Sequence, residues 1–273
     1  MKSDFDLIIQ NLPAAPEVKL YFVGDLHIGA IDSNHRAWEY FCGNILADPN
    51  AYICILGDMM NNATRSSVSS VFDDAMSPFP RPSEQKRYLV NQLKPLAPRI
   101  LCIVPGNHEG RSTKDADDEP LYDVAAKLDL EEVYRPNCAF LKICIGSRDA
   151  GRGHEKPLQV YTAAVTHGAG GGIYTGAAVN RNERMAMFVD TDILAVGHTH
   201  KGAITKPSRI HVDIHTNAVT QRSITVVSAC SWMSYGGYAL RKMLLPSSAQ
   251  DPEYPQTVIL GGLRDKRFIK TVW

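Results

Sequence analysis

The chain has 273 residues, which is long enough to bury a substantial core in one large domain or two small ones. Lys plus Arg and Asp plus Glu number 29 each, so no overall basic field argues for nucleic acid or an anionic membrane as a partner. No apolar stretch approaches the about 20 residues of a membrane span, and the N-terminus lacks the order of a secretion signal. We therefore expect a cytoplasmic protein with no membrane partner.

Five short apolar runs in the first three quarters of the chain are typical of buried strands. They cover residues 20–23, 52–56, 100–104, 160–165 and 193–196. The six cysteines contain no C-x-x-C pair, and Cys54 and Cys102 lie inside these runs. We interpret the cysteines as reduced core residues, in preference to disulfides or thiolate metal sites.

Segments between these runs have the periodicity of amphipathic helices. Asp32 or Ser33 can cap the first helix, and Ser83 can cap the second. The buried face of the first would contain Trp38, Phe41, Ile45 and Leu46. A third helix is expected over about residues 120–130. The alternation of strands and helices predicts a layered α/β fold.

The second half of the chain adds further strand-like runs. They cover residues 139–145, 209–215, 223–228, 257–260 and 268–273. These runs indicate a second sheet that packs on the first, and we expect the C-terminal part to complete it. Because the polar motifs spread from Asp25 to His200, we predict a single domain over residues 1–273.

A polar motif follows each of the first five apolar runs. The motifs are Gly24-Asp25-Leu26-His27, Gly57-Asp58, Gly106-Asn107-His108-Glu109, Thr166-His167-Gly168 and Gly197-His198-Thr199-His200. Carboxylates and imidazoles suit first-row divalent ions, and a single carboxylate can bridge two of them. Because the carboxyl ends of neighbouring strands border one crevice, the motifs predict a site for two metal ions, with Asp58 as the bridge.

Histidine shows how much depends on the order of the motifs. Five of the nine histidines fall on motif positions, and a structural role would be the better interpretation of any one alone. The ordered set favours metal binding. His211, Asp213 and His215 alternate with apolar residues and could form a third metal site, although the solvated face of a strand is the simpler interpretation.

The ordered set D-x-H, G-D, G-N-H, H and G-H-x-H resembles the calcineurin-like metallophosphoesterase superfamily over roughly residues 18–201. The D-L-H-I-G box is similar to that of its nuclease-type and phage-type members. The resemblance implies a four-layer αββα sandwich of two mixed β-sheets flanked by helices. It places one ion on Asp25, His27, Asp58 and His200, and the second on Asp58, Asn107, His167 and His198. Mn²⁺ is favoured, with Fe, Zn, Ni, Co or Mg as alternatives.

The resemblance also implies an activity, the hydrolysis of a phosphoric ester in which a hydroxide shared by the two ions attacks phosphorus in line. His108 matches the histidine that assists the leaving oxygen in the family. The family's protein phosphatases hold that histidine with an Asp, but Asn61 stands at this position. An amide can orient an imidazole but cannot stabilise its cation as a carboxylate does. Arg111 is a candidate substrate contact or a solvated loop arginine.

The substrate class follows from what the motifs lack. The phosphatases continue the G-D motif with an arginine, whereas this chain continues with Met59. We therefore expect a phosphodiester in nucleic acid or a nucleotide as the substrate, with DNA or RNA as a candidate partner in a phage or repair setting. A phosphomonoesterase is the alternative, and a metal-stabilised scaffold without catalysis is a third hypothesis. The pattern makes no prediction of oligomeric state.

Overall fold

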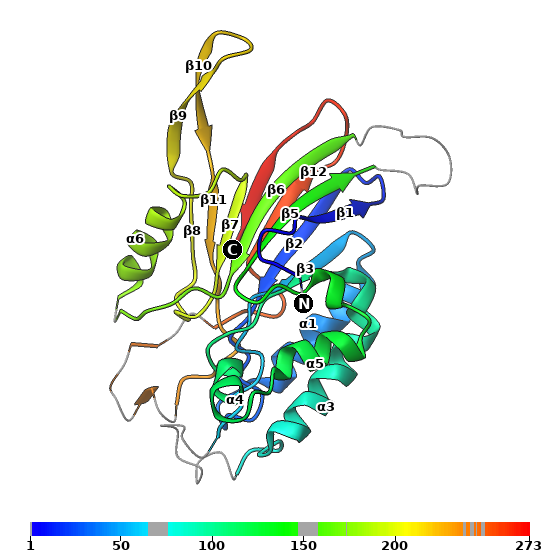
Figure 1. Ribbon diagram of the computed structural model, residues 1–273, viewed down its shortest axis with the longest axis vertical. Coiled ribbons are helices and arrows are strands. Elements are labelled where there is room, and N and C mark those ends of the chain that lie inside the picture. Colours follow the sequence, from blue (N-terminus) through cyan, green and yellow to red (C-terminus); the bar gives the residue numbers. More distant parts are fainter. Residues whose placement is uncertain are drawn as a thin grey trace.

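Two large mixed β-sheets lie face to face between helices (Figure 1). The computed structural model describes residues 2–64, 76–146, 158–172, 174–236, 239–240, 243, 245–246 and 249–273. Helices cover the outer face of each sheet within this part of the chain. The predicted four-layer αββα sandwich is therefore confirmed.

The five-stranded sheet carries the first three polar motifs. Its strand order is β13-β12-β2-β3-β4. Three neighbouring strands are parallel to one another: β2 (Glu17–Val23), β3 (Ala51–Ile55) and the edge strand β4 (Ile100–Ile103). Strand β12 (Thr257–Gly261) pairs antiparallel with β2, and β13 (Ile269–Val272) pairs antiparallel with β12. The C-terminus of the chain thus lies on the sheet of the N-terminal motifs.

The six-stranded sheet carries the last two motifs. Its strands, in spatial order, are β1 (Ile8–Leu12), β5 (Cys138–Ile145), β6 (Gln159–Thr166), β7 (Ile193–Val196), β11 (Thr225–Ser228) and β8 (Ala203–Thr205). Strands β6, β7 and β11 are parallel to one another. The carboxyl ends of β6 and β7 therefore point to the same edge of this sheet.

The division of strands between the sheets differs from the expectation. The runs at 160–165 and 193–196 were expected in the first sheet but form β6 and β7 of the six-stranded sheet. Strands β12 and β13 were expected to complete the second sheet but extend the five-stranded sheet. Val258 and Leu260 of β12 are buried beside β2 in the core between the sheets. An apolar pattern reports that a strand is buried, but it does not specify which free sheet edge the strand joins.

The core consists of three apolar layers that follow from the period of two along each strand. In β3, Cys54 faces the layer between the two sheets, whereas Ile53 and Ile55 face the helices. A smaller layer containing Leu194 and Ala186 lies under the last helix. Strands buried on both faces read as continuous apolar runs, which explains why the sequence revealed them.

The three predicted helices lie close to their expected positions. The helices on the five-stranded sheet are α1 (His35–Ala47), α3 (Pro82–Leu93) and α5 (Pro120–Lys127). The 3₁₀ turn Lys94–Arg99 follows α3, and the 3₁₀ turn Glu131–Val133 follows α5. Helix α6 (Thr175–Met185) packs on the six-stranded sheet, and α4 (Glu109–Ala116) begins within the third motif. Helices α4 and α6 were not predicted. Figure 1 shows α6 on the opposite side of the sandwich from α1, α3 and α5.

The caps of two helices differ from the predictions. Asn34 caps α1 by accepting a hydrogen bond from the amide of Ala37, and Arg81 precedes α3. The hydroxyl of Ser33 instead donates to the carbonyl of Leu26 at 2.7 Å. Leu46 was predicted to be buried but is 47% exposed. The inward face of α1 contains Cys42 instead of Leu46.

A β-hairpin projects from the sandwich (Figure 1). It consists of β9 (Ser208–Asp213) and β10 (Ala218–Ser223). The predicted alternation is present, but Ile210 and Val212 are 71% and 63% exposed, whereas His211 and Asp213 are half-buried. Within the described part of the chain, no group of metal-ligating side chains includes these residues.

Two general predictions concern the cysteines and the membrane. All six cysteines are free, and Cys54 and Cys102 are buried side by side on β3 and β4. Over the described ranges, the helices are too short or too polar to cross a bilayer.

Candidate metal centre

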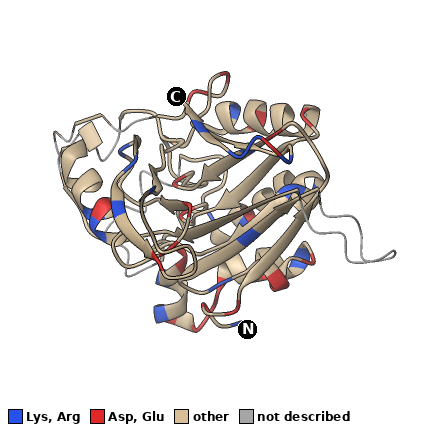
Figure 2. Cartoon of the chain, turned by 90° about the horizontal axis from the view of Figure 1, so that it is seen from above, with Lys and Arg blue, Asp and Glu red and all other residues tan. Residues whose placement is uncertain are grey.

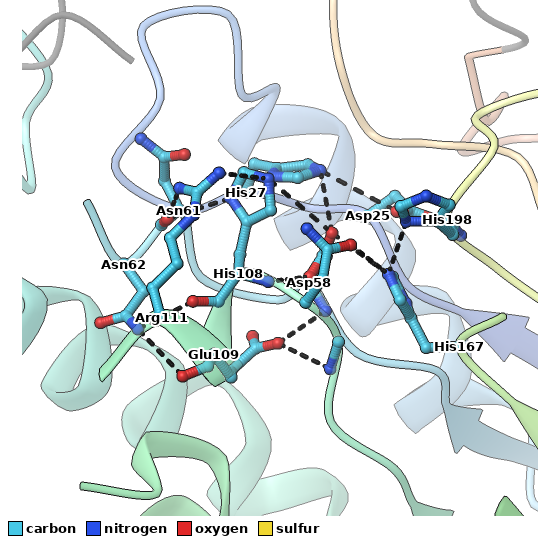
Figure 3. A network of polar contacts seen from close by, with 12 residues as sticks. Asp25, His27, Asp58, Asn61, Asn62, His108, Glu109, Arg111, His167 and His198 are labelled. Atoms are coloured by element: carbon cyan, nitrogen blue, oxygen red, sulfur yellow. Dashed lines mark hydrogen bonds and ion pairs between the residues drawn. The ribbon is translucent and has the colours of Figure 1, made fainter. Parts of the chain in front are cut away.

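The candidate site residues gather at one edge of the sandwich, where strands of both sheets end (Figure 3). Asp25 and His27 follow β2, Asp58 follows β3, Asn107 and His108 follow β4, His167 follows β6, and His198 and His200 follow β7. The prediction that five strand ends deliver side chains to one place therefore holds, although these strands come from two sheets.

The backbone turns sharply at these positions. Five of the candidate ligands have positive φ: Asp25 (53°), His27 (49°), Asp58 (48°), His198 (71°) and His200 (54°). Residues other than glycine seldom adopt this conformation, which costs on the order of 1–3 kcal/mol each. The surrounding structure enforces these turns, and each aims a polar side chain at the same point.

Two motif glycines are required because their loops approach closely. A Cβ added to Gly57 would lie 2.2 Å from the amide nitrogen of Gly106, and Gly57 has a φ of 85°. A Cβ added to Gly106 would lie 2.1 Å from Oδ1 of Asp58. The G-D and G-N-H glycines therefore allow the loops after β3 and β4 to touch.

Asp25, His27 and His200 form the first group of candidate ligands. The Nε2 atom of His200 lies 3.2 Å from Oδ1 of Asp25 and 3.1 Å from Nε2 of His27. Burial lowers the pKa of His27 well below its usual value, and the charges of His108 and His200 add to this effect. His27 is therefore a neutral imidazole whose lone pairs can bind a cation.

Asp58, Asn107, His167 and His198 form the second group. The Nε2 atom of His167 lies 3.2 Å from Oδ2 of Asp58, 3.1 Å from Oδ1 of Asn107 and 3.2 Å from Nδ1 of His198. The carbonyl oxygen of Leu56 lies 2.7 Å from Nδ1 of His167 and directs Nε2 into the site. Burial opposes protonation of His167, but the contact with Asp58 outweighs it and raises the pKa to about 9.

Asp58 lies between the two groups. Its Oδ2 is 3.2 Å from Nε2 of His167 and 4.0 Å from Nε2 of His27. Its Oδ1 accepts a hydrogen bond from the amide of His108 at 2.7 Å. Burial would raise the pKa of Asp58, but the hydrogen bond and charge of His167 lower it far below the usual range. Asp58 is therefore a buried carboxylate that both groups share.

His108 is held in one tautomer beside this carboxylate. Its Nδ1 lies 3.0 Å from the main-chain carbonyl oxygen of Asn61, and its Nε2 lies 3.0 Å from Nη2 of Arg111. Because a carbonyl only accepts and a guanidinium only donates, the proton of the neutral ring is on Nδ1. Burial lowers the pKa of His108, and the charge of Arg111 adds to this against the opposing effect of Asp58.

Asn61 thus meets the imidazole as the sequence suggested, but through its main-chain carbonyl and not its side-chain amide. The contact of Arg111 with His108 was not predicted. Arg111 donates from Nη1 to the carbonyl oxygen of Asn61 at 2.9 Å, so one carbonyl orients both His108 and Arg111. A loop was expected over residues 61–70. Its part from Arg65 onward lies in residues 65–75, which are outside the described residues.

Sequence reasoning gave no role to Glu109, which is 2% exposed. Its carboxylate accepts hydrogen bonds from the amides of Asp58 at 2.9 Å, Gly106 at 2.8 Å and Met60 at 3.0 Å. Burial and the charge of Asp58 raise the pKa of Glu109 to about 7, although the amides favour its ionised form. The signal was present, because an acidic side chain three residues after Gly106 can accept from that amide.

Asn62 and Gln85 form a second support that the motifs did not reveal. The Nδ2 of Asn62 donates to the carbonyl of His108 at 2.9 Å, and its amide donates to Oε1 of Gln85 at 2.9 Å. A Cβ added to Gly29 would lie only 2.0 Å from Nε2 of Gln85. The glycine of the D-L-H-I-G box therefore makes room for Gln85 of α3.

The family model described as calcineurin-like phosphoesterase matches residues 18–202, which is more than half of the chain. The chain belongs to this family. No curated protein matches the chain. A predicted phosphoesterase from Streptococcus pneumoniae TIGR4 is 13% identical, with 94% of this chain and 100% of that chain covered and a TM-score of 0.34. A metallophosphoesterase from Sphaerobacter thermophilus is 17% identical, with 89% and 83% covered and a TM-score of 0.35.

Membership of the calcineurin-like phosphoesterases implies metal-dependent hydrolysis of a phosphoester, and the residues present fit divalent ions. Oδ1 of Asp25 is buried and accepts no hydrogen bond, although Nε2 of His200 lies 3.2 Å away. Imidazole nitrogens of His27 and His200 face each other at 3.1 Å. A divalent ion would satisfy the carboxylate oxygen and both lone pairs at once.

Proposed function

We propose that this protein hydrolyses a phosphodiester in a nucleotide or nucleic acid with the help of two divalent metal ions, for which Mn²⁺ is favoured. Asp25, His27, Asp58 and His200 would hold one ion, and Asp58, Asn107, His167 and His198 would hold the other. The observation that carries the proposal is the position of Asp58, whose Oδ2 faces imidazoles of both groups. The bound ions would activate a water molecule and neutralise charge on the phosphoryl oxygens.

The side chains beside the ligands supply the rest of the chemistry. The guanidinium of Arg111 lies 3.0 Å from Nε2 of His108, so both groups can contact the same phosphoryl or leaving oxygen. A substrate oxygen would take the Nη2 hydrogen bond, which frees Nε2 of His108. The attacking water would release a proton, which Nε2 of His108 could accept and pass to the leaving oxygen while Nδ1 stays bonded to the carbonyl of Asn61.

The positions after Asp58 favour a diester over a monoester. Met59 stands in place of the phosphatase arginine, and both Met59 and the following Met60 are fully buried. A monoester carries a second negative charge that benefits from an additional cation, whereas a diester carries one charge. The phosphomonoesterase is therefore the second candidate. The scaffold hypothesis is weaker, because His108 and all seven proposed ligand positions are filled.

The test compares bis-p-nitrophenyl phosphate with p-nitrophenyl phosphate in the presence of Mn²⁺, with single-stranded DNA in parallel. We expect cleavage of the diester, and none by Asp58→Ala or His108→Ala. His215→Ala, at an exposed histidine of the hairpin turn, serves as the matched control. Turnover of the monoester alone would support the second candidate, and bound metal without any turnover would support the scaffold. DNA or RNA as partner, the cytoplasmic location and the phage setting stay predictions.

A further inference from the structure

A pocket of about 520 Å³ opens next to the second group of candidate ligands, and Asn107 and His167 form part of its wall. Its volume falls within the roughly 300–1,000 Å³ of small-molecule sites. A phosphoryl group at the metal centre would therefore direct one of its ester substituents into this pocket.

The pocket has an apolar floor and a polar rim. Pro120, Leu121 and Tyr134 are buried and line the floor. Thr113, Lys114 and Asn137 are exposed and form the rim. A ligand that fits such a pocket combines a ring system with hydroxyl groups or charges at its edge.

The rim is ordered by its own hydrogen bonds. Asp4 accepts from the amide of Asn137 at 2.9 Å and from its Nδ2 at 2.8 Å. Thr166 donates to the carbonyl of Asn137 at 3.0 Å and accepts from the amide of Gly168 at 3.3 Å. Because Asp4 binds the NH₂ group of Asn137, Oδ1 is the part of this side chain left to accept from a ligand.

Two charged side chains line the pocket and form no ion pair with any other described residue. Oε2 of Glu119 is buried and accepts no hydrogen bond. Lys114 forms no ion pair with any acid in the described part of the chain. An unpartnered buried carboxylate oxygen is costly, so a ligand that donates a hydrogen bond there would gain affinity.

We infer that this pocket binds the alcohol part of the substrate and that this part is a nucleoside. The inference rests on the proposed function. Rings of the floor can pack on a base, and a carboxylate such as Glu119 is the group that accepts hydrogen bonds from ribose hydroxyls in nucleotide sites. Lys114 can pair with a further phosphate at the rim.

The same features select a small nucleotide over a long strand. A strand binds through a continuous track of cations, and each neutralised phosphate contributes to affinity. Among the described residues, the pocket instead has one lysine or arginine in its lining, Lys114, together with the acidic residues Glu109 and Glu119. Figure 2 shows basic and acidic residues interspersed along the described elements.

Binding of adenosine 5′-monophosphate tests the pocket separately from catalysis. By calorimetry on the metal-loaded protein, we expect the nucleotide to bind at least about tenfold more tightly than inorganic phosphate. Glu119→Gln should weaken binding of adenosine 5′-monophosphate about tenfold and leave phosphate binding unchanged. Lys114→Met should weaken binding of adenosine 5′-diphosphate about tenfold, because this nucleotide carries a further phosphate for the rim. Lys266→Met, at an exposed lysine after β12, is the control. Equal affinities for adenosine 5′-monophosphate and phosphate, or no effect of the two variants, would overturn the inference.

Kinetics separate this inference from the proposed function. Glu119→Gln should raise KM for the dinucleotide ApA about tenfold and affect kcat/KM for bis-p-nitrophenyl phosphate less, because that diester has no ribose hydroxyl to donate to Glu119. Failure of the wild type to cleave bis-p-nitrophenyl phosphate would contradict the proposed function, while nucleotide binding would still test the pocket. A higher kcat/KM for a long oligonucleotide than for ApA would overturn the choice of a small substrate.

Discussion

The carboxylate of Glu109 accepts a hydrogen bond from the main-chain amide of Asp58 at 2.9 Å. The same carboxylate binds the amides of Gly106 and Met60, so it joins the loops that follow β3 and β4. The side chain of Asp58 and the amide of His108 make the reciprocal contact at 2.7 Å. Glu109 thus fixes the position of Asp58, although Glu109 is not itself a proposed ligand.

Glu109→Gln should displace Asp58 and destabilise the protein. The NH₂ group of glutamine cannot accept from an amide, so at least one buried N–H loses its partner, at a cost of about 1–3 kcal/mol. We expect a lower melting temperature and less bound metal, measured by thermal unfolding and elemental analysis. Glu131→Gln, at an exposed glutamate, should change neither. Unaltered metal content in Glu109→Gln would contradict this role.

His108→Asn should separate catalysis from metal binding. Nε2 of His108 lies 3.9 Å from Oδ2 of Asp58, and His108 is not among the proposed ligands. The variant should therefore retain its bound metal. We expect kcat for the diester to fall by about 10²–10⁴-fold, the usual contribution of a general acid. Loss of the metal together with activity would show that His108 acts as a ligand.

Gly29→Ala tests whether Gln85 occupies the space beside the D-L-H-I-G box. The added Cβ would meet Nε2 of Gln85 at 2.0 Å, and φ at this position is 102°. We expect a loss of about 1–3 kcal/mol in the free energy of unfolding, measured in urea. Gly43→Ala is the matched control, because its Cβ would have no neighbour within 4 Å in helix α1. That control should be neutral or stabilising.

Chelation should lower the melting temperature. A divalent ion that binds only the folded chain adds about 2.7 kcal/mol of stability at a concentration of 100 times its Kd. We expect Mn²⁺ to restore the melting temperature of the wild type after treatment with EDTA, and to have little effect on Asp58→Asn. Identical melting curves with and without Mn²⁺ would argue against a metal centre.

Asp4 connects the N-terminus to the rim of the pocket in a pH-dependent manner. Burial would raise the pKa of Asp4, but hydrogen bonds from Asn137 and Cys138 outweigh burial and lower it. A lowered pKa contributes stability above the unfolded pKa of about 3.9, and this contribution is lost as the pH falls through the folded pKa. Asp4→Asn should therefore be less stable than the wild type at neutral pH, and the difference should shrink in acid.

The strands and the ligand positions were predictable because they depend on local patterns. The run around Cys54 is apolar at every position, as expected for a strand buried on both faces, and Asp58 follows it in a glycine turn. The pairing of β12 with β2 was not predictable, since it joins residues more than two hundred positions apart. Nothing in an apolar alternation identifies a partner at that separation.

The supports of the site were harder to foresee than the ligands. Gln85 lies on the buried face of α3, four residues before Leu89, but its residue type is typical of solvated positions. It is nevertheless 1% exposed and accepts a hydrogen bond from the amide of Asn62. The contact of His108 with Asn61 uses a main-chain carbonyl, which every residue type offers. Such roles depend on tertiary position and leave little trace in residue identity.

The candidate ligands come from both sheets, so the distance between Asp58 and His167 depends on how the two sheets seat against each other. Small side chains such as Ala163 and Ala195 lie in the layer between them. A larger residue there would act as a wedge and widen the separation of the ligands without touching any of them. Substitutions in this inter-sheet layer would thus change catalysis from a distance, because the spacing between the two sheets sets the spacing between the candidate ligands.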